Sequence, residues 1–184
     1  MLTRVCVFCG SSVGTNPEYA DAARRLGSAI AMAGLGLVYG GGGSGLMGVV
    51  ARAAIARGGH VTGVMPTALV NTEHLLREVS EYHEVKGFHE RKMLMSGLSS
   101  AFMALPGGPG TLEELIEQLA CVGRDIHHKP IYLINTQGYW NCLSDLLGTM
   151  HEASPSSLGS SARYVVVETS EEAVDVFLAG RFRV

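Results

Sequence analysis

The chain has 184 residues, of which 47% are hydrophobic and 24 are glycine, and its formal net charge is −3. This length is typical of one domain with a single buried core, so we expect one domain over residues 1–184. The hydrophobic content excludes a disordered chain, and the small negative charge gives no bulk attraction to nucleic acid or to a membrane surface. We therefore expect neither nucleic acid nor a membrane as a partner.

The segment 26–51 carries no charge and is long enough to span a bilayer. Glycines interrupt it repeatedly, however, and such a backbone would leave hydrogen-bonding groups unsatisfied in lipid. The start of the chain lacks a secretory signal pattern, because Arg4 is followed by a few apolar residues before Gly10. We therefore expect a soluble, cytoplasmic protein.

Segments with strand and helix patterns alternate along the chain. Short apolar runs predict strands over residues 5–8, 35–39, 60–65, 82–85, 101–105, 131–134 and 164–167. Helical spacing and capping residues predict helices over residues 16–33, 88–98, 139–150 and 170–178, one that ends at 57 and one that begins at 111. This alternation predicts an α/β fold with a doubly wound, mostly parallel, Rossmann-like sheet. Ligands of such sheets bind at the C-terminal ends of the strands.

The cysteines and histidines give no sign of a metal site. Cys6 and Cys9 have redox or zinc-knuckle spacing, but residues three apart in a strand face opposite sides of the sheet. No second Cys-x-x-Cys pair completes a zinc site, so we expect buried, reduced thiols, as in a reducing cytosol. His127-His128 has no metal-ligand companions at helical spacing. No metal and no cofactor are therefore expected.

The segment 100–118 is the centre of the predicted fold. Its apolar start is typical of a strand buried on both faces, and Pro106 ends that strand. Three glycines follow, and Thr111 is predicted to cap a helix. A strand, a glycine turn and a helix N-terminus form an anion site from backbone N–H groups and the helix dipole. Glu113 and Glu114 are predicted in the first turn, and because one acid suffices to stabilise the helix, the second suggests chemistry.

A second glycine loop, 40–48, introduces alternative functions. It fits the Gly-x-Gly-x-x-Gly spacing of a dinucleotide-dependent oxidoreductase twice, but it follows the second strand, and no acid for a ribose follows the third. A nucleoside triphosphatase would need Gly-Lys-[Ser/Thr] after a loop, which neither loop has. A non-catalytic nucleotide-binding module would explain both loops. Release of free base from nucleoside monophosphates distinguishes an enzyme from such a module.

Motifs along nearly the whole chain resemble one known family. Residues Pro106-Gly107-Gly108-Pro109-Gly110-Thr111-Leu112-Glu113-Glu114 are similar to its Pro-Gly-Gly-x-Gly-Thr-x-x-Glu signature. The family is the LOG ("lonely guy") family of cytokinin riboside 5'-monophosphate phosphoribohydrolases, formerly mislabelled as lysine decarboxylases. Further segments similar to the family are Tyr39–Gly42, Gly45–Gly48, Met65-Pro66 with Glu73, Arg91-Lys92 with Met95, and Ile126–Pro130.

The resemblance implies hydrolysis of the N-glycosidic bond of a nucleoside 5'-monophosphate, which releases free base and ribose 5-phosphate. It implies that Glu114 stabilises an oxocarbenium-like state and orients water, and that Arg91 binds or polarises the departing group. It also implies a homodimer with active sites near the interface. The substrate-binding residues that it implies are Glu73, Lys92, Gly107, Gly108, Gly110 and Thr111.

The chain departs from the family pattern around the expected base. Pro109 stands where the family usually has Tyr, and Ala120-Cys121 replaces a Thr-Trp pair. The ribose-phosphate end of the motif is largely unchanged. Both a prenylated adenine nucleotide and AMP therefore stay open as substrates.

Overall fold

The computed structural model describes residues 2–70, 74–153 and 164–180. Its strands are β1 (Arg4–Phe8), β2 (Gly36–Tyr39), β3 (Val61–Pro66), β4 (Glu81–Val85), β5 (Ala101–Ala104), β6 (Ile131–Ile134) and β7 (Tyr164–Val167). Its α-helices are α1 (Pro17–Met32), α2 (Gly45–Ala56), α3 (Phe88–Leu98), α4 (Pro109–Gly123), α5 (Asn141–Ala153) and α6 (Ser170–Leu178). Two short 3₁₀ helices are η1 (Thr67–Leu69) and η2 (Thr136–Gly138).

The strands form one seven-stranded sheet in the order β4-β3-β2-β1-β5-β6-β7. Every neighbouring pair is parallel, so the predicted parallel sheet is confirmed, and no described strand is antiparallel to it. The chain moves outward from β1 to β4 and then returns to place β5 beside β1, with Val5 opposite Ala101. The strand order therefore reverses between β1 and β5, and a doubly wound sheet binds ligands at such a point.

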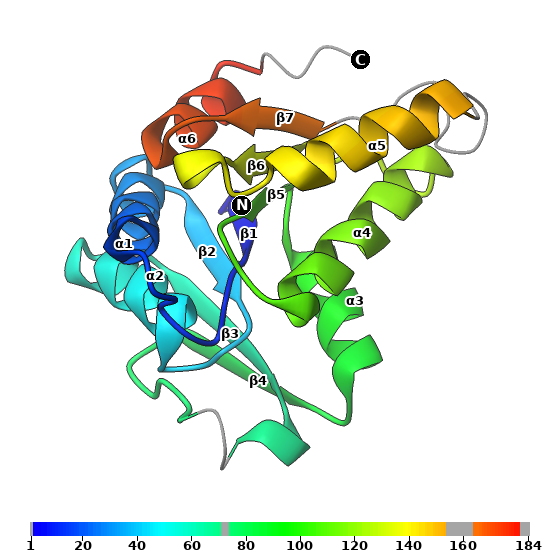
Figure 1. The fold of residues 1–184 in the computed structure, drawn as a ribbon. Coiled ribbons are helices and arrows are strands. Elements are labelled where there is room, and N and C mark those ends of the chain that lie inside the picture. Colours follow the sequence, from blue (N-terminus) through cyan, green and yellow to red (C-terminus); the bar gives the residue numbers. More distant parts are fainter. Residues whose placement is uncertain (1, 71–73, 154–163, 181–184) are drawn as a thin grey trace.

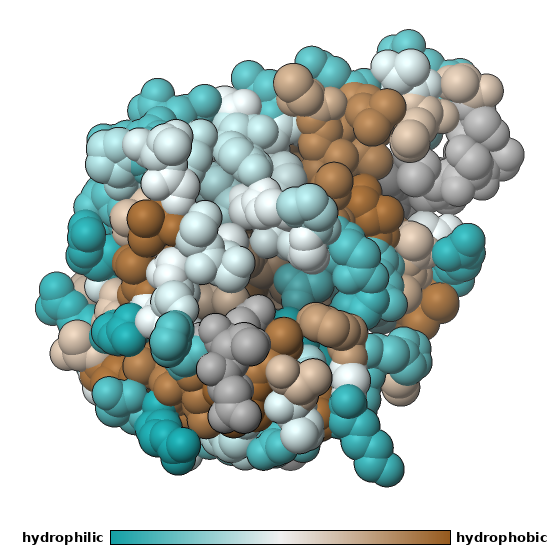
Figure 2. All heavy atoms as spheres, turned by 60° about the horizontal axis from the view of Figure 1, so that its bottom comes forward, coloured by the Kyte–Doolittle hydropathy of each residue, from teal (hydrophilic) through white to brown (hydrophobic). Residues whose placement is uncertain are grey.

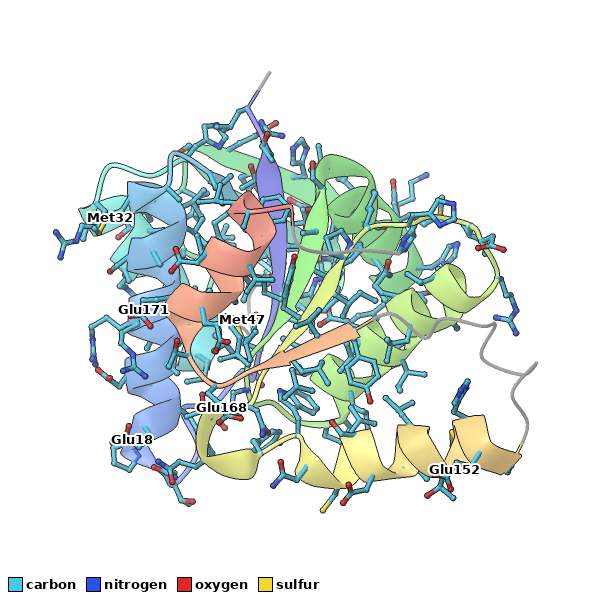
Figure 3. The ribbon with its side chains drawn as sticks, turned by 90° about the horizontal axis from the view of Figure 1, so that it is seen from above. Glu18, Met32, Met47, Glu152, Glu168 and Glu171 are labelled. Carbon is cyan, nitrogen blue, oxygen red and sulfur yellow. The ribbon has the colours of Figure 1, made fainter. Side chains whose placement is uncertain are left out.

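Helices cover both faces of the sheet (Figure 1). One face packs against α1, α2 and α6, and the other packs against α3, α4 and α5. In Figure 3 the sheet lies between these layers, with Met47 near the middle of the molecule and Met32 at its outer edge. Cys6 and Cys9 belong to the cores on opposite faces, as the strand pattern predicts.

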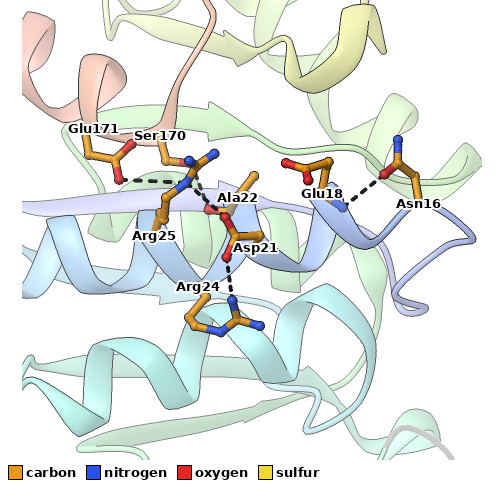
Figure 4. A network of polar contacts seen from close by, with 8 residues as sticks. All are labelled: Asn16, Glu18, Asp21, Ala22, Arg24, Arg25, Ser170 and Glu171. Atoms are coloured by element: carbon orange, nitrogen blue, oxygen red, sulfur yellow. Dashed lines mark hydrogen bonds and ion pairs between the residues drawn. The ribbon is translucent and has the colours of Figure 1, made fainter.

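The first helix shows how local sequence and packing agree. The Asn16 side chain caps α1 by accepting a hydrogen bond from Glu18 N at 3.0 Å, and Pro17 follows at the first helical position. At the other end of the chain, the buried Ser170 hydroxyl of α6 donates to Ala22 O at 2.8 Å (Figure 4). The Asn16 cap fixes the start of α1, and the Ser170 hydrogen bond joins α1 to the last helix of the described chain, α6.

Two expectations need correction. All four cysteines are free, but Cys142 on the solvent side of α5 is exposed and Cys121 is half-buried, so the expectation of buried thiols holds for Cys6 and Cys9 alone. The helix α4 begins at Pro109 with Gly108 as its N-cap, so Thr111 is not the cap. Pro109 fits the first helical position because its missing N–H needs no partner there. In the described part of the chain, no helix is long and apolar enough to cross a membrane.

Candidate active site

A cleft of about 220 Å³ lies where the strand order reverses, at the C-terminal ends of the central strands. Figure 2 shows the surface hollowed near the centre of that view. The residues that line the cleft are Val7, Cys9, Ser11, Gly40, Met47, Phe88, Arg91, Met95, Gly108, Pro109, Gly110, Thr111 and Glu114. They come from both glycine loops and from α3 and α4, which lie far apart in the sequence.

The start of α4 is an open anion site. The first N–H groups of a helix have no partner within the helix, and no side chain of the described residues caps this one. Gly108, Gly110 and Thr111 line the cleft, so the positive end of the helix dipole is directed toward it. Because the helix begins two residues before Thr111, Glu113 and Glu114 lie in its second turn and not in the predicted first turn.

The start of α2, after the other glycine loop, is closed by the protein itself. The N–H groups of Leu46 and Met47 donate to Gly10 O at 3.0 and 3.4 Å. Gly45 allows this contact, because it has a φ of +60° and a Cβ atom there would lie 2.2 Å from the backbone carbon of Ser11. The loop 40–48 therefore supports the β1 turn, and its helix offers fewer unpaired donors to a ligand.

Arg91, in the first turn of α3, is 7% exposed and lines the cleft. Its Nη2 donates to Gly40 O at 3.1 Å, and among the described residues its Nε has no hydrogen-bond partner. Gly40 is required here, because a Cβ atom would lie 1.7 Å from that Nη2. No carboxylate of the described residues lies within ion-pair distance of Arg91. A buried cation with spare donors is suited to a polar or anionic ligand.

Glu114 extends from α4 into the same cleft. The Cys9 thiol is affected by both charged groups: burial raises its pKa well above the usual range, Glu114 raises it further and Arg91 lowers it. A carboxylate and a guanidinium therefore both lie near one point beside the first strand. Because its pKa is raised, Cys9 stays a neutral thiol and is a poor nucleophile.

The structure does not bring all the predicted substrate residues to the cleft. The Lys92 ammonium pairs with the carboxylates of Glu113 and, at 3.3 Å, of Glu117 on α4, and Lys92 is not among the lining residues. Burial alone would lower the pKa of Lys92, but these two carboxylates outweigh it and the pKa is raised. Glu73 lies outside the described residues.

A second pocket of about 460 Å³ adjoins the cleft and shares Ser11 and Gly108 with it. Gly107 lines this pocket, and its carbonyl accepts a hydrogen bond of 2.5 Å from the Tyr139 hydroxyl. The other lining residues are Gly10, Ser12, Val13, Gly14, Thr15, Tyr19, Leu46 and Pro106. Ser11 was not predicted as a site residue from the sequence. The signal for it was its position shortly after β1, at the C-terminal end of a strand, where ligands of such sheets bind.

Among the described residues, no group of three His, Cys, Asp or Glu side chains could hold a metal ion. The site instead combines backbone donors, one guanidinium and one carboxylate. Such groups can bind a phosphate and act on a neighbouring bond as acid, base or electrostatic stabiliser.

Comparison with known proteins gives one consistent family. The family described as "Possible lysine decarboxylase" matches residues 47–177. A "Probable cytokinin riboside 5'-monophosphate phosphoribohydrolase" of Oryza sativa subsp. japonica is 44% identical over 174 residues, which is 94% of this chain and 82% of the relative. A cytokinin riboside 5'-monophosphate phosphoribohydrolase of Arabidopsis thaliana is 43% identical over 164 residues, which is 89% of this chain and 76% of the relative.

The solved structure of a molybdenum cofactor binding protein from Rippkaea orientalis is similar in fold, with a TM-score of 0.73 and coverage of 98% of both chains. Its sequence is 22% identical to this chain, so the likeness extends to the fold alone.

Proposed function

The chain belongs to the LOG family, and from that premise we propose that it hydrolyses the N-glycosidic bond of a nucleoside 5'-monophosphate, releasing free base and ribose 5-phosphate. The observation that carries the proposal is the convergence of Arg91, Glu114 and the open start of α4 on one cleft. A binding module needs the open helix start, but it has no need of a half-buried carboxylate and a buried guanidinium beside it.

The phosphate binds at the start of α4. The N–H groups of Gly108, Gly110 and Thr111 and the helix dipole are complementary to a dianion. The neighbouring pocket, which shares Gly108 and contains Gly107, extends this polar surface. The cleft of about 220 Å³ is small for a whole nucleotide, so we propose that the substrate spans both pockets.

Glu114 acts on the sugar. As the bond from C1' to the base nitrogen breaks, the bonding electron pair leaves with the base and positive charge develops on the ribose. The Glu114 carboxylate stabilises that charge and orients a water molecule, whose oxygen forms the new bond to C1'. The proton released by the water passes to the Glu114 carboxylate and from there to solvent, while the departing base takes one proton from solvent, so that the sum is the addition of one water molecule.

Arg91 acts on the departing base. Its guanidinium is held by Gly40 O, and the free Nε leaves donors for a ring nitrogen that gains electron density in the transition state. Met47, Met95 and Phe88 provide an apolar wall for the face of the base. Arg91 and the apolar wall would contact the adenine ring itself, with or without a prenyl group. We therefore expect little discrimination between AMP and a prenylated AMP.

We also propose a cytoplasmic homodimer. Large apolar side chains are exposed on α3 and α4, with exposed fractions of 63% for Met93, 40% for Leu112 and 39% for Ile116. Figure 2 shows hydrophobic side chains gathered in the upper right of that view, toward α4 and α5. A second copy would bury this face next to the cleft, and light scattering at several concentrations would reveal the dimer.

Chromatography of the products from a nucleotide panel tests the activity. Two charge-assisted hydrogen bonds of about 1.5–3 kcal/mol each would separate AMP from adenosine by about two orders of magnitude or more in catalytic efficiency. We expect free adenine from AMP and free base from prenylated AMP, with hardly any from adenosine. Cleavage of adenosine within tenfold of AMP would contradict the phosphate site, and binding of nucleotides without any released base would favour the binding module.

A further inference from the structure

A chain of hydrogen bonds joins α3, α4 and the segment before β6, on the face of the sheet that carries Arg91 and Glu114. The Gln118 Oε1 atom accepts from the Ser96 hydroxyl at 3.3 Å and contacts His127 Nε2 at 3.1 Å. His127 Nδ1 accepts from the Lys129 backbone N–H at 3.3 Å. The Lys129 ammonium donates to Ser96 O at 2.7 Å, which closes the chain of contacts. We call Ser96, Gln118, His127 and Lys129 the clasp.

The clasp joins the two helices that carry the reacting side chains Arg91 and Glu114. Gln118 lies one helical turn after Glu114 on the same side of α4, and it is 4% exposed. Ser96 lies in the second half of α3, whose first turn carries Arg91. The two helices come from different parts of the chain, so their relative position depends on side chains that bridge them. The clasp is a partly buried bridge centred on the buried Gln118, while the ion pairs of Lys92 join the same helices where Glu113 is exposed.

The bonds assign one tautomer to His127. Because Gln118 Oε1 is an acceptor, His127 Nε2 carries the proton, and because Nδ1 accepts from Lys129 N–H, it carries none. A protonated imidazole would lose that acceptor and would place a second positive charge beside the Lys129 ammonium. The clasp therefore requires neutral His127.

We propose that His127 is a positioning residue for hydrolysis: in its neutral form it holds α3 and α4, and hence Arg91 and Glu114, at the separation that the reaction needs. The inference rests on the proposed function for its effect on activity. A displacement of about 1 Å between reacting groups can cost about 10²-fold in rate. A partly buried bridge that starts one turn after Glu114 on α4 and ends on the helix of Arg91 is therefore well placed to affect turnover.

The groups around His127 explain at which pH the clasp opens. Burial lowers the pKa of His127, and the charges of Lys129 and His128 lower it further. The neighbours from the other elements are neutral: Ser96 on α3, Gln118 on α4 and the Phe102 ring of β5, whose centroid is 5.5 Å from the imidazole centroid. Protonation is therefore expected below the usual histidine value of about 6.5.

A His127→Gln variant tests the proposal, because its side-chain amide keeps a donor for Gln118 but cannot titrate. With saturating AMP, wild-type kcat should fall as the pH drops below the usual histidine range, because the His127 pKa is lowered. His127→Gln should lose that part of the decline while KM stays within threefold. His127→Ala should lower kcat about tenfold where wild-type His127 is neutral, and its difference from the wild type should shrink at acid pH, where the wild-type clasp opens. His128→Gln is the matched control, since His128 is exposed and makes none of the clasp's hydrogen bonds; it should keep the acid decline, displaced slightly upward. The same acid decline in His127→Gln would overturn the proposal.

A measurement without substrate separates this proposal from the proposed function. Proton–nitrogen NMR spectra of the imidazole rings should show His127 as the Nε2–H tautomer, with a pKa below the usual histidine value. A His127 pKa at or above that usual value, or the Nδ1–H tautomer at His127, would overturn the clasp even in an active enzyme. If the wild-type protein released no base from any nucleotide, the proposed function would fail, and the spectra would still decide whether the clasp exists.

Discussion

The helices α2 and α4 both begin at a glycine loop on the C-terminal edge of the sheet, yet their first N–H groups have different partners. At α2, the carbonyl of Gly10 accepts from Leu46 and Met47. At α4, no described side chain caps the helix, and its first turn lines the cleft. One strand–glycine–helix pattern therefore supports the fold, while the other is left for a ligand. A glycine pattern by itself cannot distinguish these two uses, because the difference lies in a carbonyl contributed from another part of the chain.

The largest effect is expected at the α4 side of this comparison. Glu114→Gln keeps the shape of the side chain and the open helix start but removes the negative charge that stabilises the developing positive charge on the ribose. We expect kcat to fall by about 10²–10⁴-fold, a loss typical of a removed general base, with KM for AMP little changed. Single-turnover assays and the melting temperature measured on the same sample separate catalysis from folding. Turnover close to that of the wild type would reject Glu114 as the catalytic carboxylate.

Two glycine substitutions test the comparison itself. Gly45→Ala should lower stability by about 1–3 kcal/mol, because φ is +60° and the new Cβ would meet the Ser11 backbone. At roughly 2–4 °C per kcal/mol for a domain of this size, the change is measurable as a lower melting temperature. The expected loss of stability comes from backbone strain at the start of α2, whose first N–H groups are already paired within the protein.

Gly108→Ala is the matched variant at the open helix start. Its φ is −83°, and a Cβ atom there meets no described atom within 4 Å, so the fold should accept alanine. The added methyl group would occupy space shared by the cleft and the adjoining pocket, and we expect KM for AMP to rise about tenfold, equivalent to about 1.4 kcal/mol, with an unchanged melting temperature. If Gly108→Ala lowered stability as Gly45→Ala does, or if neither variant changed KM, the two helix starts would not differ in function.

The alternation of strand and helix was predictable because buried parallel strands and amphipathic helices have distinct periods. The bounds of β7 and α6 agree with the prediction. The start of α4 was misplaced because Pro109 at the first helical position and Thr111 as a cap both satisfy local rules. Which of them holds depends on the tertiary path of the chain after β5.

Of the candidate site, the sequence could predict the open end of α4 but not what faces it. Arg91 reaches the cleft because α3 leads from the edge strand β4 back to the central strand β5, a path that no local pattern reveals. It could be predicted that Arg91 and Lys92 would not both line the cleft. Consecutive residues of a helix are about 100° apart around its axis and rarely face one pocket. The role of Gly10 O depends on a contact between distant backbone segments.

The smallest effect on catalysis is expected for a substitution of Lys92. Neither Lys92 nor the two carboxylates that it pairs with line the cleft. The family resemblance implies a substrate contact, but its ammonium pairs with Glu113 and Glu117 on α4. Ion pairs that reach solvent contribute about 0–1 kcal/mol, and Glu113 is 60% exposed at its side chain. Lys92→Met keeps most of the apolar stem, so kcat/KM for AMP should stay within about threefold of the wild type, since threefold corresponds to about 0.7 kcal/mol. Measured beside His127→Ala, the variant compares a link between α3 and α4 through the exposed Glu113 with a link through the buried Gln118. A loss of more than tenfold in kcat/KM without a change in melting temperature would show that Lys92 leaves its carboxylates to bind substrate, which would extend the ligand site from the start of α4 to the outer side of α3.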